Sequence, residues 1–85
     1  MEINAKSTDR KLLLELTGEL DHQGAAQAIR ELELALDAAL PLHLALDLSG
    51  VTFMDSSGIA LILRPQRRMQ TLGGSLLVCR VPQQA

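Results

Sequence analysis

The stretch that decides the fold is FMDSSGIA at residues 53–60, where an apolar strand is expected to end and an apolar helix to begin. An aspartate, two serines and a glycine form the polar junction between them. Such a junction places its side chains at the surface, beside the unpaired N–H groups of the first helical turn. Ser56 is therefore the first candidate either to perform a reaction or to receive one.

Downstream of this junction the sequence predicts a helix over about 56–71 and a last strand over 75–81. The helix contains Pro65, which is expected to kink it because proline removes a helical hydrogen bond. A glycine pair at 73–74 predicts the turn into the strand. The residues expected on the buried side of the helix are Ile59, Ile62, Leu63 and Met69.

Upstream, strands are predicted at 1–6 and 11–17, followed by a loop at 18–21 and a helix over about 22–39. Asp21 is the expected N-cap of this helix, and Pro41 is expected to end it. The apolar stripe of the helix consists of Ala25, Ile29, Leu32, Leu36 and Leu40.

The segment 42–48 alternates leucines with more polar residues, and Ser49-Gly50 is expected to break this strand. A strand covered by helices on both faces would be apolar throughout, so helices are predicted mainly on one face of the sheet. The fold class is therefore a single α/β domain over residues 1–85. It has a mixed β-sheet and the element order β-β-α-β-α-β.

Composition excludes several classes of function. A hydrophobic content of 47% excludes a disordered chain, and a net charge of −2 with one aromatic residue argues against direct nucleic-acid binding. The arginines at 64, 67 and 68 are expected to form a solvated helix face. No run is long enough for a membrane span, and the lone Cys79 suggests a buried thiol in a reducing, cytoplasmic setting. His22, His43 and Cys79 lack the spacing of a metal site, and no cofactor is expected.

Ser56 has three readings on these grounds. Asp55 or Ser56 could simply cap the second helix, which is the default for such a sequence. Ser56 could be a nucleophile with His22, which follows Asp21 at the other helix start. Against catalysis, the serine lies outside a Gly-x-Ser-x-Gly elbow and 85 residues leave little room for a substrate pocket. The chain is therefore not expected to be an enzyme, and Ser56 could instead be modified.

Three motifs in order, TGELD at 17–21, LDLSGV at 46–51 and FMDSSG at 53–58, resemble those of a STAS domain. GGS at 73–75 fits the same pattern, and the resemblance runs from about residue 12 to 82. The most similar branch is the bacterial anti-sigma factor antagonists of the sporulation type.

The resemblance implies that Ser56 is the phosphorylation site. An anti-sigma factor with serine kinase activity would bind the unphosphorylated chain and release its sigma factor, and phosphorylation would end that binding. A PP2C-like phosphatase would reset the switch. The partner-binding residues implied are Asp21, Asp55, Ser56, Ser57 and Gly58. The alternative is a non-phosphorylated STAS scaffold subunit, as in a stressosome or a phospholipid-transport complex.

The chain departs from the family pattern in two places. Family members continue past the strand at 75–81, whereas this sequence ends at Ala85, so the C-terminal part of the usual fold is expected to be missing. An open edge on the last strand would favour self-association. Pro65 also interrupts the helix that the resemblance assigns to the partner surface.

Overall fold

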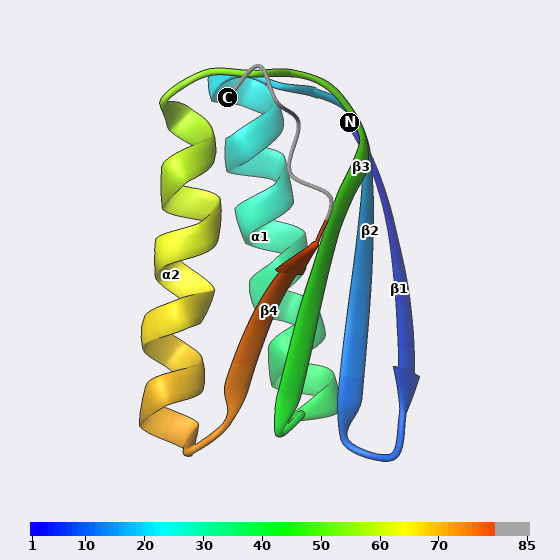
Figure 1. Ribbon diagram of the computed structural model, residues 1–85, viewed down its shortest axis with the longest axis vertical. Helices are drawn as coiled ribbons and strands as arrows, with labels where there is room; N and C mark the ends of the chain where they lie inside the picture. The colour runs from blue at the N-terminus through cyan, green and yellow to red at the C-terminus, as the bar shows by residue number, and fades with distance from the viewer. Residues whose placement is uncertain (80–85) are drawn as a thin grey trace.

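A computed structural model describes residues 1–79, which form a four-stranded sheet and two helices (Figure 1). The predicted element order β-β-α-β-α-β is confirmed. The elements are β1 (Glu2–Thr8), β2 (Lys11–Leu20), α1 (His22–Ala39), β3 (His43–Met54), α2 (Ser57–Leu72) and β4 (Ser75–Cys79). The last part of the strand predicted over 75–81 lies outside the described residues.

The sheet has the order β1-β2-β3-β4, and both helices cover the same face (Figure 1). β1 and β2 form an antiparallel hairpin, whereas β2, β3 and β4 run parallel to one another. The two helical crossovers step in the same direction across the sheet. Since such crossovers are right-handed, both helices must pack on one side, as the alternating strands predict.

The core lies between the helices and the covered face of the sheet. Leu12, Leu14 and Leu16 of β2 face it together with alternate leucines of β3. α1 contributes the stripe predicted for it, except that Leu40 is the left-handed C-cap residue and is 56% exposed. The largest fully buried side chains contributed by β3 and the helices are Leu32, Leu36, Leu44, Leu46, Leu48, Leu61, Pro65 and Met69.

Three strands run further than the sequence predicts, and β1 continues to Thr8, two residues past its predicted end. β2 continues to Leu20, so residues 18–20 are strand and not loop, and β3 passes through Ser49-Gly50 without a break. The register between the two strands shifts twice, between Glu15 and Thr17 and between Gly18 and Glu19. The shifts accommodate the turn-like residues Gly18 and Ser49-Gly50 within the strands. Parallel pairing therefore continues to the ends of both strands.

The buried face of α2 also differs from the prediction. The helix buries Gly58, Leu61, Pro65 and Met69, whereas Ile59 and Leu63 are exposed. Only Met69 of the predicted buried set is fully inside, and Ile62 is half-buried. α2 runs continuously across Pro65, whose ring packs into the core at less than 2% exposure.

Candidate functional site

The candidate site lies where β2 and β3 end and where both helices begin (Figure 1). Leu20 and Met54 are paired in the parallel ladder, so the residues that follow them, Asp21 and Asp55, emerge side by side. The Asp55 N–H donates to the Leu20 carbonyl at 3.4 Å, which ties the two strand ends together. The fold thus brings together two acidic residues that are 34 positions apart in the chain.

Each aspartate caps a helix. Asp21 Oδ1 accepts a hydrogen bond from the Gly24 N–H at 2.8 Å, which confirms it as the N-cap of α1. Asp55 Oδ1 accepts from the Ser57 N–H at 2.8 Å in the first turn of α2. Both carboxylates therefore compensate backbone donors at the positive ends of helices.

Ser56 occupies the N-cap position of α2 without capping it. Its backbone is already helical, with φ −63° and ψ −20°, and its side chain makes no capping hydrogen bond. Among residues 1–79 the Ser56 hydroxyl has no hydrogen-bond partner, and the residue is exposed. Asp55 therefore satisfies the helix end and leaves the Ser56 hydroxyl uncommitted.

An apolar surface adjoins this hydroxyl. Met54, Asp55, Ser56 and Ile59 line a hollow of about 220 Å³. Ile59 is 53% exposed, and Leu63 follows it one helical turn later at 45% exposed. Residues four positions apart lie on the same side of a helix, so Ile59 and Leu63 form an exposed apolar ridge. An exposed apolar ridge of this kind is typical of a protein-binding surface.

The two remaining predicted site residues lie deeper. Ser57 is half-buried, and its N–H is the group that Asp55 caps. Gly58 is buried against the strand ends: a Cβ placed there would lie 2.7 Å from Met54 Cε and 3.0 Å from Leu20 Cδ2. Gly58 thus allows α2 to start close to the sheet, and this close approach fixes the position of Ser56 at the start of the helix.

The charged side chains of the segments that form the site are all acidic. Residues 17–24 and 51–63 contain Glu19, Asp21 and Asp55 and no lysine or arginine. His22 is exposed at the start of α1, and no hydrogen bond links it to Ser56 in the described part of the chain. The arginines of α2 lie further along the helix. Arg64 pairs with Glu33 of α1 at 3.5 Å, Arg68 pairs with Asp37 of α1, and Arg67 is exposed.

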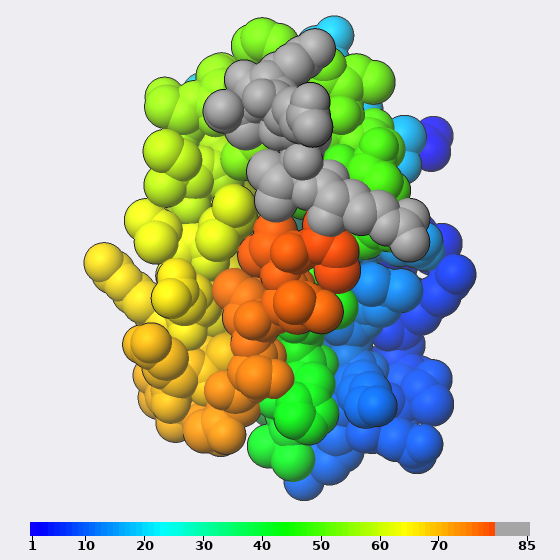
Figure 2. Space-filling model, in the orientation of Figure 1, coloured from blue at the N-terminus to red at the C-terminus, as the bar shows by residue number. Residues whose placement is uncertain are grey.

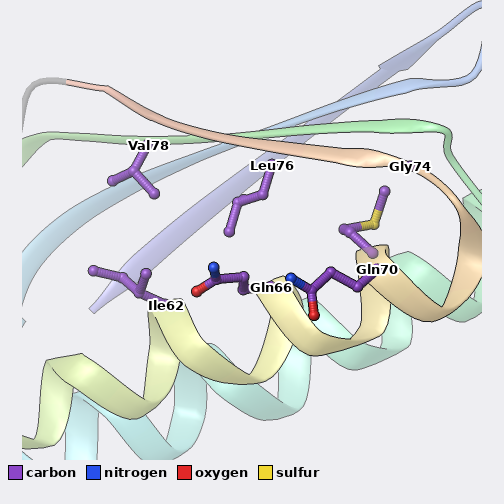
Figure 3. A pocket seen from close by; sticks show the side chains of 7 residues that line it. Ile62, Gln66, Gln70, Gly74, Leu76 and Val78 are labelled. Carbon is purple, nitrogen blue, oxygen red and sulfur yellow. The ribbon is translucent and has the colours of Figure 1, made fainter.

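A second hollow, of about 330 Å³, lies between α2 and β4, away from titratable groups (Figure 3). Ile62, Leu76 and Val78 face into it, with the amides of Gln66 and Gln70 beside them. In Figure 2 the orange-red atoms of β4 reach the surface beside α2, as expected for a strand at the sheet edge. The residues that line this hollow suit packing against another apolar surface and include no titratable side chain.

Residues 1–79 contain no group of three metal-ligating side chains. Within the same residues, neither helix has the length and apolar character needed to cross a membrane. The polar side chains grouped at the site are the Ser56 hydroxyl and the carboxylates of Asp21 and Asp55.

Comparison with known proteins identifies the family. The STAS domain family matches residues 2–85. The chain belongs to the STAS family. Two curated relatives are both named anti-sigma F factor antagonist. The protein from Paenibacillus polymyxa is 34% identical over 70 residues, and the one from Lysinibacillus sphaericus is 30% identical over 71.

These matches cover 82% and 84% of this STAS chain, and 60% and 61% of the relatives. The chain therefore spans about three-fifths of the length of the curated relatives it matches.

Two solved structures share the STAS fold seen here. The anti-sigma factor antagonist SpoIIAA in its unphosphorylated form superposes with a TM-score of 0.77 at 24% identity, over 98% of this chain and 77% of that one. The Bacillus cell fate determinant SpoIIAA in the phosphorylated form gives 0.76 at 25% identity, with the same coverage. This chain thus superposes almost equally well on both forms.

Proposed function

We propose that this STAS domain is an anti-sigma factor antagonist that is switched by phosphorylation of Ser56. The observation that carries the proposal is the Ser56 hydroxyl, which is exposed, free of hydrogen bonds and held at the start of α2 by the Asp55 cap. A kinase can reach this hydroxyl without breaking any contact within the domain. The names of the curated relatives support the same class of function.

In the unphosphorylated form, the partner is an anti-sigma factor that is also a serine kinase. It contacts the exposed ridge of Ile59 and Leu63 and the carboxylates of Asp21 and Asp55, with Ser56 between them. Ser57 and Gly58 set the position of this surface by fixing the first turn of α2. Binding of the antagonist releases the sigma factor.

Phosphorylation changes the charge of this surface by about −1.5 to −2. The start of α2 tolerates a phosphate, because the helix dipole favours negative charge there. A partner docked over Ser56 meets instead a bulky dianion beside Asp21 and Asp55, with no lysine or arginine in residues 17–24 or 51–63 to balance it. The complex dissociates, and a PP2C-like phosphatase restores binding.

The domain acts in this scheme as substrate and ligand and not as an enzyme. The kinase consumes ATP, which places the switch in the cytoplasm. The ridge, the two carboxylates and the free hydroxyl together argue for a regulated surface and not for a permanent scaffold contact, since a scaffold needs no unbonded serine at its centre.

The test is phosphorylation of the purified chain by an anti-sigma F factor with ATP, followed by tandem mass spectrometry. We expect one phosphate, located on Ser56 and lost in Ser56→Ala. Ser57→Ala is the matched control and should still be phosphorylated, because Ser57 contributes its N–H and not its hydroxyl to the cap. A phosphate on Ser57, or none on the wild-type chain, would contradict the proposal and favour the scaffold.

A further inference from the structure

The face of the sheet opposite the helices carries side chains in cross-strand rows that the strand register defines. These rows are named here by position along β2, β3 and β4. The first row is Lys11, His43 and Ser75; the central row is Leu13, Ala45 and Leu77; the third row is Glu15, Asp47 and Cys79. A basic row and an acidic row therefore flank an apolar one.

This open face is accessible in the described part of the chain. Leu77 is 64% exposed, Lys11 and His43 are exposed, and Leu13 and Ala45 are half-exposed. Because the small Ala45 lies between two leucines, the face is hollowed there. The hollow measures about 490 Å³, and Lys11, His43 and Leu77 contribute to its walls. An apolar floor with a charged rim is typical of a surface that another molecule covers.

We propose that a second copy of this chain covers the open face, in a symmetric sheet-on-sheet dimer whose two-fold axis runs along the central row. Rotation about that axis reverses the strand direction and keeps each strand opposite its own copy. Sheets packed face to face lie about 10 Å apart with their strands nearly aligned, which suits this arrangement. Leu13, Ala45 and Leu77 then meet the same three residues of the second copy.

Charge complementarity argues for a second copy over any other occupant. The same rotation places Lys11 opposite Glu15 of the second copy, and His43 opposite Asp47 of the second copy, because these residues are equally far from the central row. Each dimer thus gains one Lys11–Glu15 pair on either side of the axis. An isologous contact of this kind requires a self-complementary face, which the three rows provide.

The existing contacts on this face are compatible with the dimer. Glu15 binds the Lys6 ammonium at 3.2 Å, and a carboxylate has further acceptor sites for a second cation. His43 Nδ1 lies 2.8 Å from Ser75 Oγ, which leaves Nε2 to face the second copy. Lys6 pairs with Leu13, so it is the β1 member of the central row and lies opposite Lys6 of the second copy. Its side chain is 63% exposed and reaches Glu15, whose carboxylate compensates its charge.

The dimer leaves the candidate site free. Ser56 lies beyond the end of β3, and reversal of the strands puts the two Ser56 residues of a dimer at opposite ends. The proposal is therefore independent of the phosphorylation switch, and either can fail alone. A four-stranded face is smaller than a standard interface, so dissociation in the micromolar range or weaker is expected.

Sedimentation velocity over about 10 μM to 1 mM, with unphosphorylated wild-type chain, tests the proposal. Lys11→Glu and Glu15→Lys each place like charges opposite one another, and each should weaken dimerisation about tenfold or more. The double variant Lys11→Glu/Glu15→Lys restores opposite charges and should recover most of the affinity. If the double variant dimerises no better than the singles, the proposed pairing is wrong.

Leu77→Ser tests the central row and should abolish the dimer over the same range. Leu34→Ser is the matched control, because Leu34 is 69% exposed on α1, on the other side of the molecule. Circular dichroism should show that all variants keep the fold. A wild-type chain that stays monomeric at 1 mM would overturn the proposal and leave this face to a different occupant.

Discussion

At the scale of single residues, the site divides two tasks between neighbours. Asp55 caps α2 through the Ser57 N–H, and Ser56 keeps a hydroxyl that serves no structural purpose. The sequence predicts a cap at Asp55 or Ser56 but cannot say which, because both are good N-cap residues. The choice depends on the backbone of Ser56, which is already helical, whereas a capping residue is usually extended.

This division predicts different stabilities for two adjacent alanine variants. Asp55→Ala removes the cap and should lower the free energy of unfolding by about 1 kcal/mol. Ser56→Ala removes no hydrogen bond and should change the free energy of unfolding by less than about 0.5 kcal/mol. Urea denaturation followed by circular dichroism measures both. An equal loss in the two variants would show that Ser56 also supports the helix.

Two glycines near the site predict a second contrast. A Cβ at Gly24 would lie 2.2 Å from the Glu19 carbonyl oxygen, which the backbone holds in place. A Cβ at Gly58 would instead meet the tip of the Met54 side chain, which can move. We expect Gly24→Ala to cost about 3 kcal/mol of stability and Gly58→Ala clearly less. Thermal and urea unfolding of both variants provide the comparison, and the opposite order would contradict it.

At the scale of elements, the sequence predicts those whose pattern is periodic and local. α1 has a single apolar stripe and a clear cap, and its predicted bounds are confirmed. α2 carries five consecutive apolar residues at 59–63, so periodicity alone does not select its buried face. The fold selects it by placing Gly58 against Leu20 and Met54, which turns Leu61 and Pro65 inward.

The ends of β2 and β3 were mispredicted for a related reason. Glycine and serine at 49–50 indicate a turn locally, yet pairing with β2 supplies a partner for that stretch of β3. Gly50 also permits a close approach that a side chain would block, since a Cβ there would lie 2.9 Å from the Leu16 carbonyl oxygen. Both the pairing with β2 and the close approach at Gly50 involve residues distant in sequence, so a short stretch of sequence cannot predict them.

The register of α2 gives an element-scale prediction. Leu61 is 1% exposed and Leu63 is 45% exposed. Leu61→Ala should therefore cost about 2–5 kcal/mol through lost burial and a residual cavity. Leu63→Ala should cost well under 1 kcal/mol and should instead weaken binding of the anti-sigma factor. Chemical denaturation and isothermal titration calorimetry separate the two effects. A larger loss of stability for Leu63→Ala than for Leu61→Ala would contradict this register and support the buried face predicted from sequence.

At the scale of the whole molecule, one fold has to serve both states of the proposed switch. The chain superposes on solved relatives in the unphosphorylated and phosphorylated forms with TM-scores of 0.77 and 0.76. A phosphate on Ser56 does not oblige the core to rearrange, because Ser56 is exposed and the helix end favours negative charge. The switch then acts on the surface alone.

We therefore expect phosphorylated Ser56 to leave the fold unchanged and to abolish partner binding. Amide chemical shifts should change only at the ends of β2 and β3 and in the first turns of α1 and α2. A loss of about 3–4 kcal/mol in binding free energy would weaken the complex several-hundred-fold. Repulsion between the phosphate and the carboxylates of Asp21 and Asp55, together with the poorer fit to the partner, must supply this loss. The contribution of charge should appear as a weaker effect in Asp21→Asn, measured by titration of the phosphorylated chain against the anti-sigma factor. Shift changes spread over the sheet would show instead that phosphorylation acts by refolding the domain.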